Sequence, residues 1–177
     1  TTKVSSQWIE KSLLMDRIIT ISEHSKQVYE NTSCPAQNAQ TGEVISEFKT
    51  TTPIEVVHYP VRDYEPSDMG LELDYDFNFL TVAQISPRKN ADSLIRWFVE
   101  EFKNEEVGLV IKGNIVCNSQ YDKLETQKRI SSLLKEYPDR KCKVYLLHGS
   151  LTNEEIAYLY QHPQIKSYVT LAHGEGF

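Results

Sequence analysis

Apolar runs and amphipathic runs alternate along residues 77–177. The apolar runs predict buried strands at 77–84, 107–111, 143–147 and 166–171. The segments between them place apolar residues at three-to-four spacing and predict helices. Strict alternation of strand and helix indicates parallel pairing, and strands without a polar face indicate helices on both faces of the sheet. We therefore predict an α/β fold, a Rossmann-like three-layer α/β/α sandwich with a parallel sheet.

Helix boundaries are marked by residues that satisfy unpaired backbone groups. Thr152 and Glu155 have the spacing of a capping box, and Pro138 follows the helix predicted over about 119–137. We expect Asn90 to cap the helix that follows the first of these strands.

The pattern is less regular before residue 77. Runs at 16–22 and 53–60 predict strands, and Ser22 is placed to cap a short helix between them. Residues 33–53 are rich in Thr, Ser and Gln and indicate a loop. Residues 61–76 are acidic, contain Pro and Gly and have no period, which predicts a linker. The predicted parts are thus 1–60, the linker 61–76, and the domain 77–177.

Composition excludes several classes of function. The formal net charge is -6 and no long basic run is present, which argues against nucleic acid as a partner. The three cysteines form no C-x-x-C pair, which favours a reducing, cytoplasmic setting. The five histidines show no zinc-ligand spacing, and no apolar run has membrane-spanning length. We expect neither a metal nor a transmembrane segment, although a peripheral place at a membrane stays open.

Ligands of such a sheet bind beyond the carboxyl ends of its strands. The loops at these ends are 84–90, 112–114, 148–152 and 172–177. In the second loop Lys112 is directed either at an anion or at water, of which we favour water, and in the third we expect His148 to be a structural histidine. The loops at 84–90 and 172–177 contain more residues that are able to bind a ligand.

Arg88 and Lys89 directly precede the helix that begins after Asn90. A helix N-terminus presents unpaired N–H groups and a partial positive charge, so two added cations suit a phosphate or diphosphate. The alternative is that both are solvated loop charges. The chain has no G-x-G-x-x-G fingerprint for a dinucleotide.

Glu175 stands between Gly174 and Gly176. Glycines allow a ligand to approach the backbone closely, and a carboxylate accepts hydrogen bonds from hydroxyl groups. This combination suits a sugar. The alternative is a glycine-rich turn with an exposed glutamate.

Taken together and in order, the four loops resemble those of a known family. The segments FLTVAQISPRKNADSLIRWF, GLVIKGN, VYLLHGSLTNEEIAYLY and HGEGF resemble the carboxy-terminal domain of retaining glycosyltransferases with the two-domain GT-B fold, the glycosyl transferases group 1 family. The resemblance covers essentially all of 77–177. Residues 16–60 look like the end of the amino-terminal, acceptor-side domain.

The resemblance implies a hexosyltransferase. Its donor is a UDP- or GDP-sugar, and the sugar passes to an acceptor hydroxyl with retained anomeric configuration. The sequence does not identify the acceptor, which is a glycan, a lipid or a protein. The family stabilises the departing diphosphate without a metal or other cofactor, using an Arg, a Lys and backbone N–H groups. Lys89 matches the Lys. Gln84 occupies the position of the Arg, so the clamp is either weaker or built differently, with Arg88 as a substitute.

The remaining matches concern the sugar and the base. Glu175 aligns with the first glutamate of the family's Glu–seven residues–Glu motif, which holds donor-sugar hydroxyls, and Gly174 and Gly176 offer backbone contacts. Gly149 to Leu151 match a loop that lines the nucleotide base. The second glutamate falls beyond Phe177, so we expect a truncated chain that is inactive or nearly so alone and whose bare cleft face promotes self-association.

Two rival interpretations remain. The chain is alternatively a non-catalytic nucleotide- or sugar-binding or assembly domain derived from a glycosyltransferase, with Gln84 as a sign of lost activity. Another Rossmann-like enzyme, such as a sugar-nucleotide epimerase, is disfavoured because a dinucleotide requires the missing glycine-rich turn.

Overall fold

The computed structural model of the protein describes residues 2–38 and 40–174. The chain divides between Arg62 and Asp63 into two compact units, each of which is considered by itself. Among the described residues, no helix is both long and apolar enough to cross a membrane.

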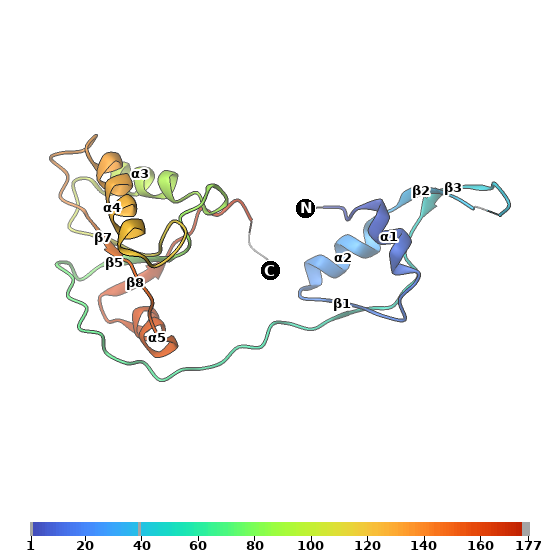
Figure 1. Ribbon diagram of the computed structural model, residues 1–177, viewed down its shortest axis with the longest axis horizontal. Coiled ribbons are helices and arrows are strands. Elements are labelled where there is room, and N and C mark those ends of the chain that lie inside the picture. The colour runs from blue at the N-terminus through green and yellow to red at the C-terminus, as the bar shows by residue number, and fades with distance from the viewer. Residues whose placement is uncertain (1, 39, 175–177) are drawn as a thin grey trace. The chain divides into compact units, whose positions relative to one another are not determined.

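The second unit is built on a four-stranded parallel sheet (Figure 1) with the strand order β7-β6-β5-β8. Its strands are β5 (Asn78–Val82), β6 (Gly108–Lys112), β7 (Lys143–Leu147) and β8 (Ile165–Tyr168). Its helices are α3 (Ala91–Phe102), α4 (Gln120–Leu134) and α5 (Asn153–Gln161). The predicted α/β fold class with a parallel sheet is therefore confirmed.

The helices cover both faces of this sheet, as Figure 1 shows. Successive residues of β6 point to opposite faces, because side chains alternate along a strand. Leu109 and Ile111 pack with Phe98 of α3 and Ile130 of α4, and Val110 packs on the other face with Leu159 of α5. Each face thus has its own apolar core, which explains why the β6 sequence has no polar face.

The helix caps are partly as predicted. Thr152 and Glu155 form both hydrogen bonds of a capping box at the start of α5, and Ser119 accepts a hydrogen bond from the N–H of Asp122 at the start of α4. The side chain of Asn90, however, forms no cap at α3. Asn90 instead adopts a left-handed conformation with φ 51°, because a 3₁₀ turn, Pro87–Lys89, directly precedes it.

The segment predicted as a linker belongs partly to this second unit. Residues 61–73 contain no helix or strand, but Leu73 is buried against the α5 face of the sheet together with Leu80. The carboxylate of Asp74 accepts a 2.7 Å hydrogen bond from Tyr145 and lies 2.7 Å from the ammonium of Lys143. Burial, followed by this hydrogen bond, raises the pKa of Tyr145 to about 12.

The first unit contains two small sheets. Its elements are α1 (Ser6–Ser12), β1 (Ile18–Thr20), α2 (Glu23–Asn31), β2 (Cys34–Gln37), β3 (Val44–Phe48) and β4 (Ile54–Val56). β1 pairs with β4 in parallel, and Ser22 caps α2 as expected. The predicted loop over 33–53 is wrong, because β2 and β3 form an antiparallel hairpin there. Most of β3 is exposed, so its sequence carries no apolar alternation that would reveal the strand.

Candidate functional site

The carboxyl ends of three neighbouring strands lie level with one another. Val82 at the end of β5 pairs with Lys112 at the end of β6, which in turn pairs with Leu147 at the end of β7. The loops that follow line an open pocket of about 350 Å³. It is lined by Val82, Ala83, Gln84, Lys112, Gly113, Asn114, Asn118, Gly149, Ser150, Leu151 and Ile156. A ligand pocket at this edge is what the parallel sheet predicts.

Two glycines give this pocket its backbone shape. A Cβ atom on Gly113 would lie 2.2 Å from the carbonyl oxygen of Ala83, so only glycine lets the two strand ends approach this closely. Gly149 has φ +105°, a conformation that residues with a side chain rarely adopt. Both positions therefore require glycine for reasons that involve no ligand.

Lys112 lies among the lining residues of the pocket and is half-buried. Its Nζ atom donates a 2.6 Å hydrogen bond to the carbonyl oxygen of Gly149. Burial lowers the pKa of Lys112, because the ammonium is partly removed from water. Along the described chain no carboxylate forms an ion pair with it. The sequence favoured water as the partner of Lys112, whereas one of its N–H groups is bonded to a protein carbonyl.

Amide and hydroxyl groups connect the loops around the pocket. The Nδ2 atom of Asn114 donates a 2.6 Å hydrogen bond to Asn118, whose own amide donates a 2.8 Å hydrogen bond to the hydroxyl of Ser150. Gln84 donates a 2.9 Å hydrogen bond to the carbonyl oxygen of Ile115. The loops after β5, β6 and β7 are thereby joined by neutral polar groups that are able both to donate and to accept.

One carboxylate holds the loop after β6 in place. Asp122 is buried and accepts hydrogen bonds from the backbone N–H groups of Ile115, Val116 and Cys117 at 3.0, 2.7 and 3.0 Å. Nε2 of His148 lies 2.8 Å from Oδ1, the oxygen that also accepts from the N–H of Ile115. Burial alone would raise the pKa of Asp122, but these hydrogen bonds outweigh it and hold the pKa well below its usual range.

The loop with the two predicted phosphate-binding cations lies between β5 and α3. The backbone carbonyl of Arg88 accepts a 2.9 Å hydrogen bond from the N–H of His173, and its guanidinium donates to the carbonyl of Gly174. The loop after β8 is therefore tied to the 3₁₀ turn that contains Lys89. Segments more than eighty residues apart in sequence meet at this point.

The described site residues that the sequence predicted lie in the loops around this edge of the sheet. Gln84, Gly149 and Leu151 line the same pocket. Arg88 and Gly174 are hydrogen-bonded to each other, and Lys89 adjoins Arg88 in the 3₁₀ turn. Glu175 and Gly176 lie outside the described residues. The structure thus brings the described candidates to the loops at one edge of the sheet.

Other residues of the site were not found from the sequence. Lys112, Asn114 and Asn118 line the pocket although none was chosen as a site residue. A signal for Asp122 was available, because Ser119 followed three residues later by an acidic residue is a helix-start pattern. No comparable signal marks Lys112, since its direction depends on a glycine turn in another loop.

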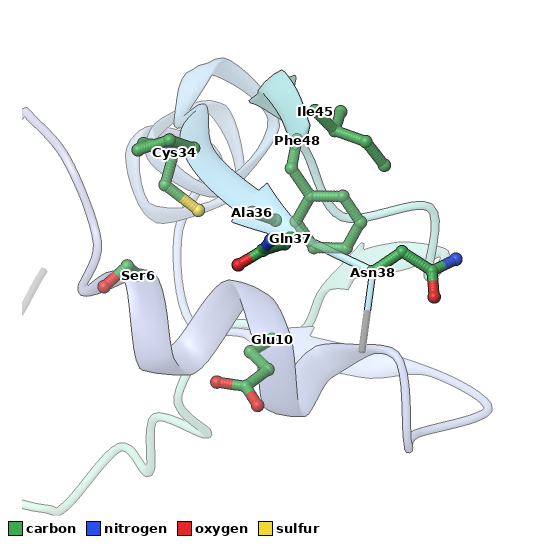
Figure 2. Close-up of a pocket in the computed structure, with 9 residues that line it drawn as sticks. Ser6, Glu10, Cys34, Ala36, Gln37, Asn38, Ile45 and Phe48 are labelled. Atoms are coloured by element: carbon green, nitrogen blue, oxygen red, sulfur yellow. The ribbon is translucent and has the colours of Figure 1, made fainter. Parts of the chain in front are cut away.

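A larger pocket, of about 450 Å³, lies within the first unit. Figure 2 shows that it lies between α1 and the β2–β3 hairpin, with Glu10, Cys34 and Phe48 among its lining residues. It contains no Lys or Arg among these residues, so it offers no cation to a phosphate. The pocket also contains none of the predicted site residues, and we assign the site to the second unit.

The chain matches no protein-family model. It also matches no curated protein sequence. Among solved structures it is similar to the apo structure of OtsA, a trehalose-6-phosphate synthase that is a GT-B glycosyltransferase, with a TM-score of 0.56 and 10% sequence identity. The match covers 92% of this chain and 40% of that one, so the chain spans less than half of its neighbour. The fold is glycosyltransferase-like.

Proposed function

We propose that this chain carries the nucleotide-sugar-binding half of a retaining glycosyltransferase, which transfers a hexose from a UDP- or GDP-sugar to an acceptor hydroxyl. One observation carries the proposal. The pocket at the ends of β5, β6 and β7 shares its edge of the sheet with a loop that contains Arg88 and Lys89 and is bonded to His173 and Gly174. A nucleotide sugar consists of a base, a diphosphate and a sugar. In this proposal the base lies in the pocket, the diphosphate lies against the loop with Arg88 and Lys89, and the sugar lies against the loop that contains His173 and Gly174.

In this proposal the diphosphate lies against Lys89 and the start of α3. Negative charge grows on the diphosphate as the glycosidic bond breaks, so cations and N–H groups that are already in place stabilise the transition state more than the ground state. Arg88 and Gln84 assist, and Gln84 contributes a neutral donor. Glu175 accepts hydrogen bonds from donor-sugar hydroxyls, with backbone contacts from Gly174 and Gly176.

The base, the metal ion, the acceptor and the cellular setting belong to the same proposal. Gly149 to Leu151 line the place of the base. No metal ion takes part. Lys89 and Arg88 stabilise the negative charge of the diphosphate, which a metal ion would stabilise in other enzymes. The acceptor binds on the side supplied by the amino-terminal part of the enzyme, and the reaction takes place in the cytoplasm, where the three described free cysteines stay reduced.

Calorimetric titration with UDP and GDP tests this proposal. We expect binding of at least one of them in the millimolar range or tighter, and a loss of roughly tenfold or more in Lys89→Ala, because a charge-assisted hydrogen bond is removed. Lys135→Ala is the matched control, since Lys135 is the exposed C-cap residue of α4. A folded sample that binds neither nucleotide would contradict the proposal.

One observation favours a second candidate, a non-catalytic binding or assembly domain. The amide of Gln84 is bonded to the carbonyl of Ile115, and it carries no charge where the resembled family has an arginine. Such a domain would bind nucleotide or sugar without transferring it. Sugar transfer by the complete gene product separates the two candidates.

A further inference from the structure

The pocket at the ends of β5, β6 and β7 contains a cation that the diphosphate clamp does not use. Lys112 lies on β6, whereas Arg88 and Lys89 lie in the loop between β5 and α3. Its one described acceptor is the carbonyl oxygen of Gly149. An ammonium has three N–H groups, so two remain for a ligand.

The surroundings of Lys112 suit a planar ring better than a phosphate. Val82, Leu151 and Ile156 supply apolar surface to the pocket, and Asn114, Asn118 and Ser150 supply neutral polar groups. A phosphate group needs several donors around a compact charge. A nucleobase has two apolar faces and an edge of donors and acceptors, which matches apolar surface combined with amides and one cation.

We infer that Lys112 is a specificity-determining residue that donates a hydrogen bond to a keto oxygen of the nucleobase and thereby selects uracil or guanine over adenine. This inference rests on the proposed function and deepens it. Adenine has an exocyclic amino group in place of the keto oxygen, so at that position of the ring it would place a donor against the ammonium. A site built around a hydrogen bond discriminates strongly against a ligand that leaves the bond unmade.

The hydrogen bond to Gly149 makes this selection more specific. It places the ammonium of Lys112 against the carbonyl oxygen of Gly149, a residue with φ +105°. A fixed donor loses little conformational freedom when the ligand binds. The loop that the resemblance assigns to the base therefore contributes by orienting Lys112 as well as by lining the pocket.

The test compares UDP, GDP, ADP and inorganic pyrophosphate on wild type and Lys112→Met. Met keeps the apolar stem and removes the charge. We expect wild type to bind UDP or GDP at least about tenfold more tightly than ADP, and Lys112→Met to lose roughly tenfold or more for that nucleotide while its affinity for pyrophosphate is unchanged. Lys89→Met is the control for the diphosphate site, and it should weaken the binding of both nucleotide and pyrophosphate.

Each other outcome has a definite meaning. Wild type that binds neither pyrophosphate nor nucleotide contradicts the proposed function itself. Wild type that binds ADP as tightly as UDP and GDP overturns the inference alone, and this comparison does not depend on the folding of any variant. A Lys112→Met protein that keeps its affinity for UDP and GDP, or that loses pyrophosphate as well, also overturns it.

Discussion

Nε2 of His148 lies 2.8 Å from Oδ1 of Asp122, and both side chains are almost fully buried. An ionised carboxylate only accepts hydrogen bonds, so Nε2 carries the proton of this bond. The pair joins the loop after β7 to the start of α4, and Asp122 also holds the backbone of the loop after β6. Two loops that line the pocket are thus positioned by a single carboxylate that is not itself among its lining residues.

The first prediction concerns Asp122→Asn. An amide offers one acceptor oxygen in place of two and places an NH₂ group against backbone N–H groups, so buried donors lose their partners. We expect the thermal midpoint to fall by at least about 5 °C, with weaker UDP or GDP binding in the protein that remains folded. Differential scanning calorimetry and titration measure the two effects. Asp139→Asn, at an exposed turn after α4, should change neither.

The second prediction concerns the pH dependence of stability. The pKa of Asp122 is lower in the folded than in the unfolded protein, so the unfolded state binds the proton more readily. The carboxylate therefore contributes its full stability above the ordinary pKa of about 4 and loses it as the pH falls toward the lowered folded value. Urea midpoints between pH 3 and 7 should fall more steeply at the acid end in wild type than in Asp122→Asn. Parallel curves would exclude this role.

The third prediction separates two reasons for a glycine. Gly113→Ala forces a methyl group against the Ala83 carbonyl and should destabilise by about 1–3 kcal/mol or more. Gly149→Ala meets no atom within 4 Å but strains the backbone at φ +105°, with a cost of about 1–3 kcal/mol. Gly174→Ala has neither problem and should stay within about 0.5 kcal/mol. Urea unfolding ranks the three; equal midpoints would contradict both arguments.

The glycine variants should also differ in their effect on the pocket. Gly149→Ala moves the carbonyl that orients Lys112, so nucleotide affinity should fall even where the protein stays folded. Gly113→Ala acts at the strand ends themselves, so its main effect should be on folding stability and not on nucleotide affinity. Nucleotide affinity that is unaffected in folded Gly149→Ala would show that this turn does not position Lys112.

The sequence predicted the second unit well because its signals are local. The strand β7 has the predicted bounds, 143–147, and the capping box at Thr152 needs only the residues of one turn. The continuous apolar run at 107–111 indicates that β6 is buried on both faces of the sheet. These features follow from hydrophobic period and from backbone groups that require a partner nearby in sequence.

The features that escaped prediction depend on contacts between distant residues. The β2–β3 hairpin is mostly exposed, so pairing rather than burial defines it. Asn90 fails to cap α3 because the preceding 3₁₀ turn fixes its backbone. The role of Lys112 follows from a carbonyl thirty-seven residues further along the chain. No pattern within a single segment contains this information.

The last prediction concerns Gln84→Arg. Gln84 is exposed, lines the pocket and belongs to the loop that leads to Arg88 and Lys89. An arginine there adds a charge-assisted donor for phosphate, so pyrophosphate and UDP or GDP affinity should rise by roughly tenfold, with a larger gain at low ionic strength. Gln161→Arg, an exposed position at the end of α5, controls for net charge alone.

The outcome decides whether Gln84 faces the diphosphate. A gain in Gln84→Arg that is absent in Gln161→Arg would show that position 84 lies within reach of the diphosphate, as an arginine does in the resembled family. Equal gains in both variants would reduce the effect to long-range attraction. An unchanged affinity would show that the amide of Gln84 serves to hold the carbonyl of Ile115, which would leave Lys89 and Arg88 as the described cations of the clamp.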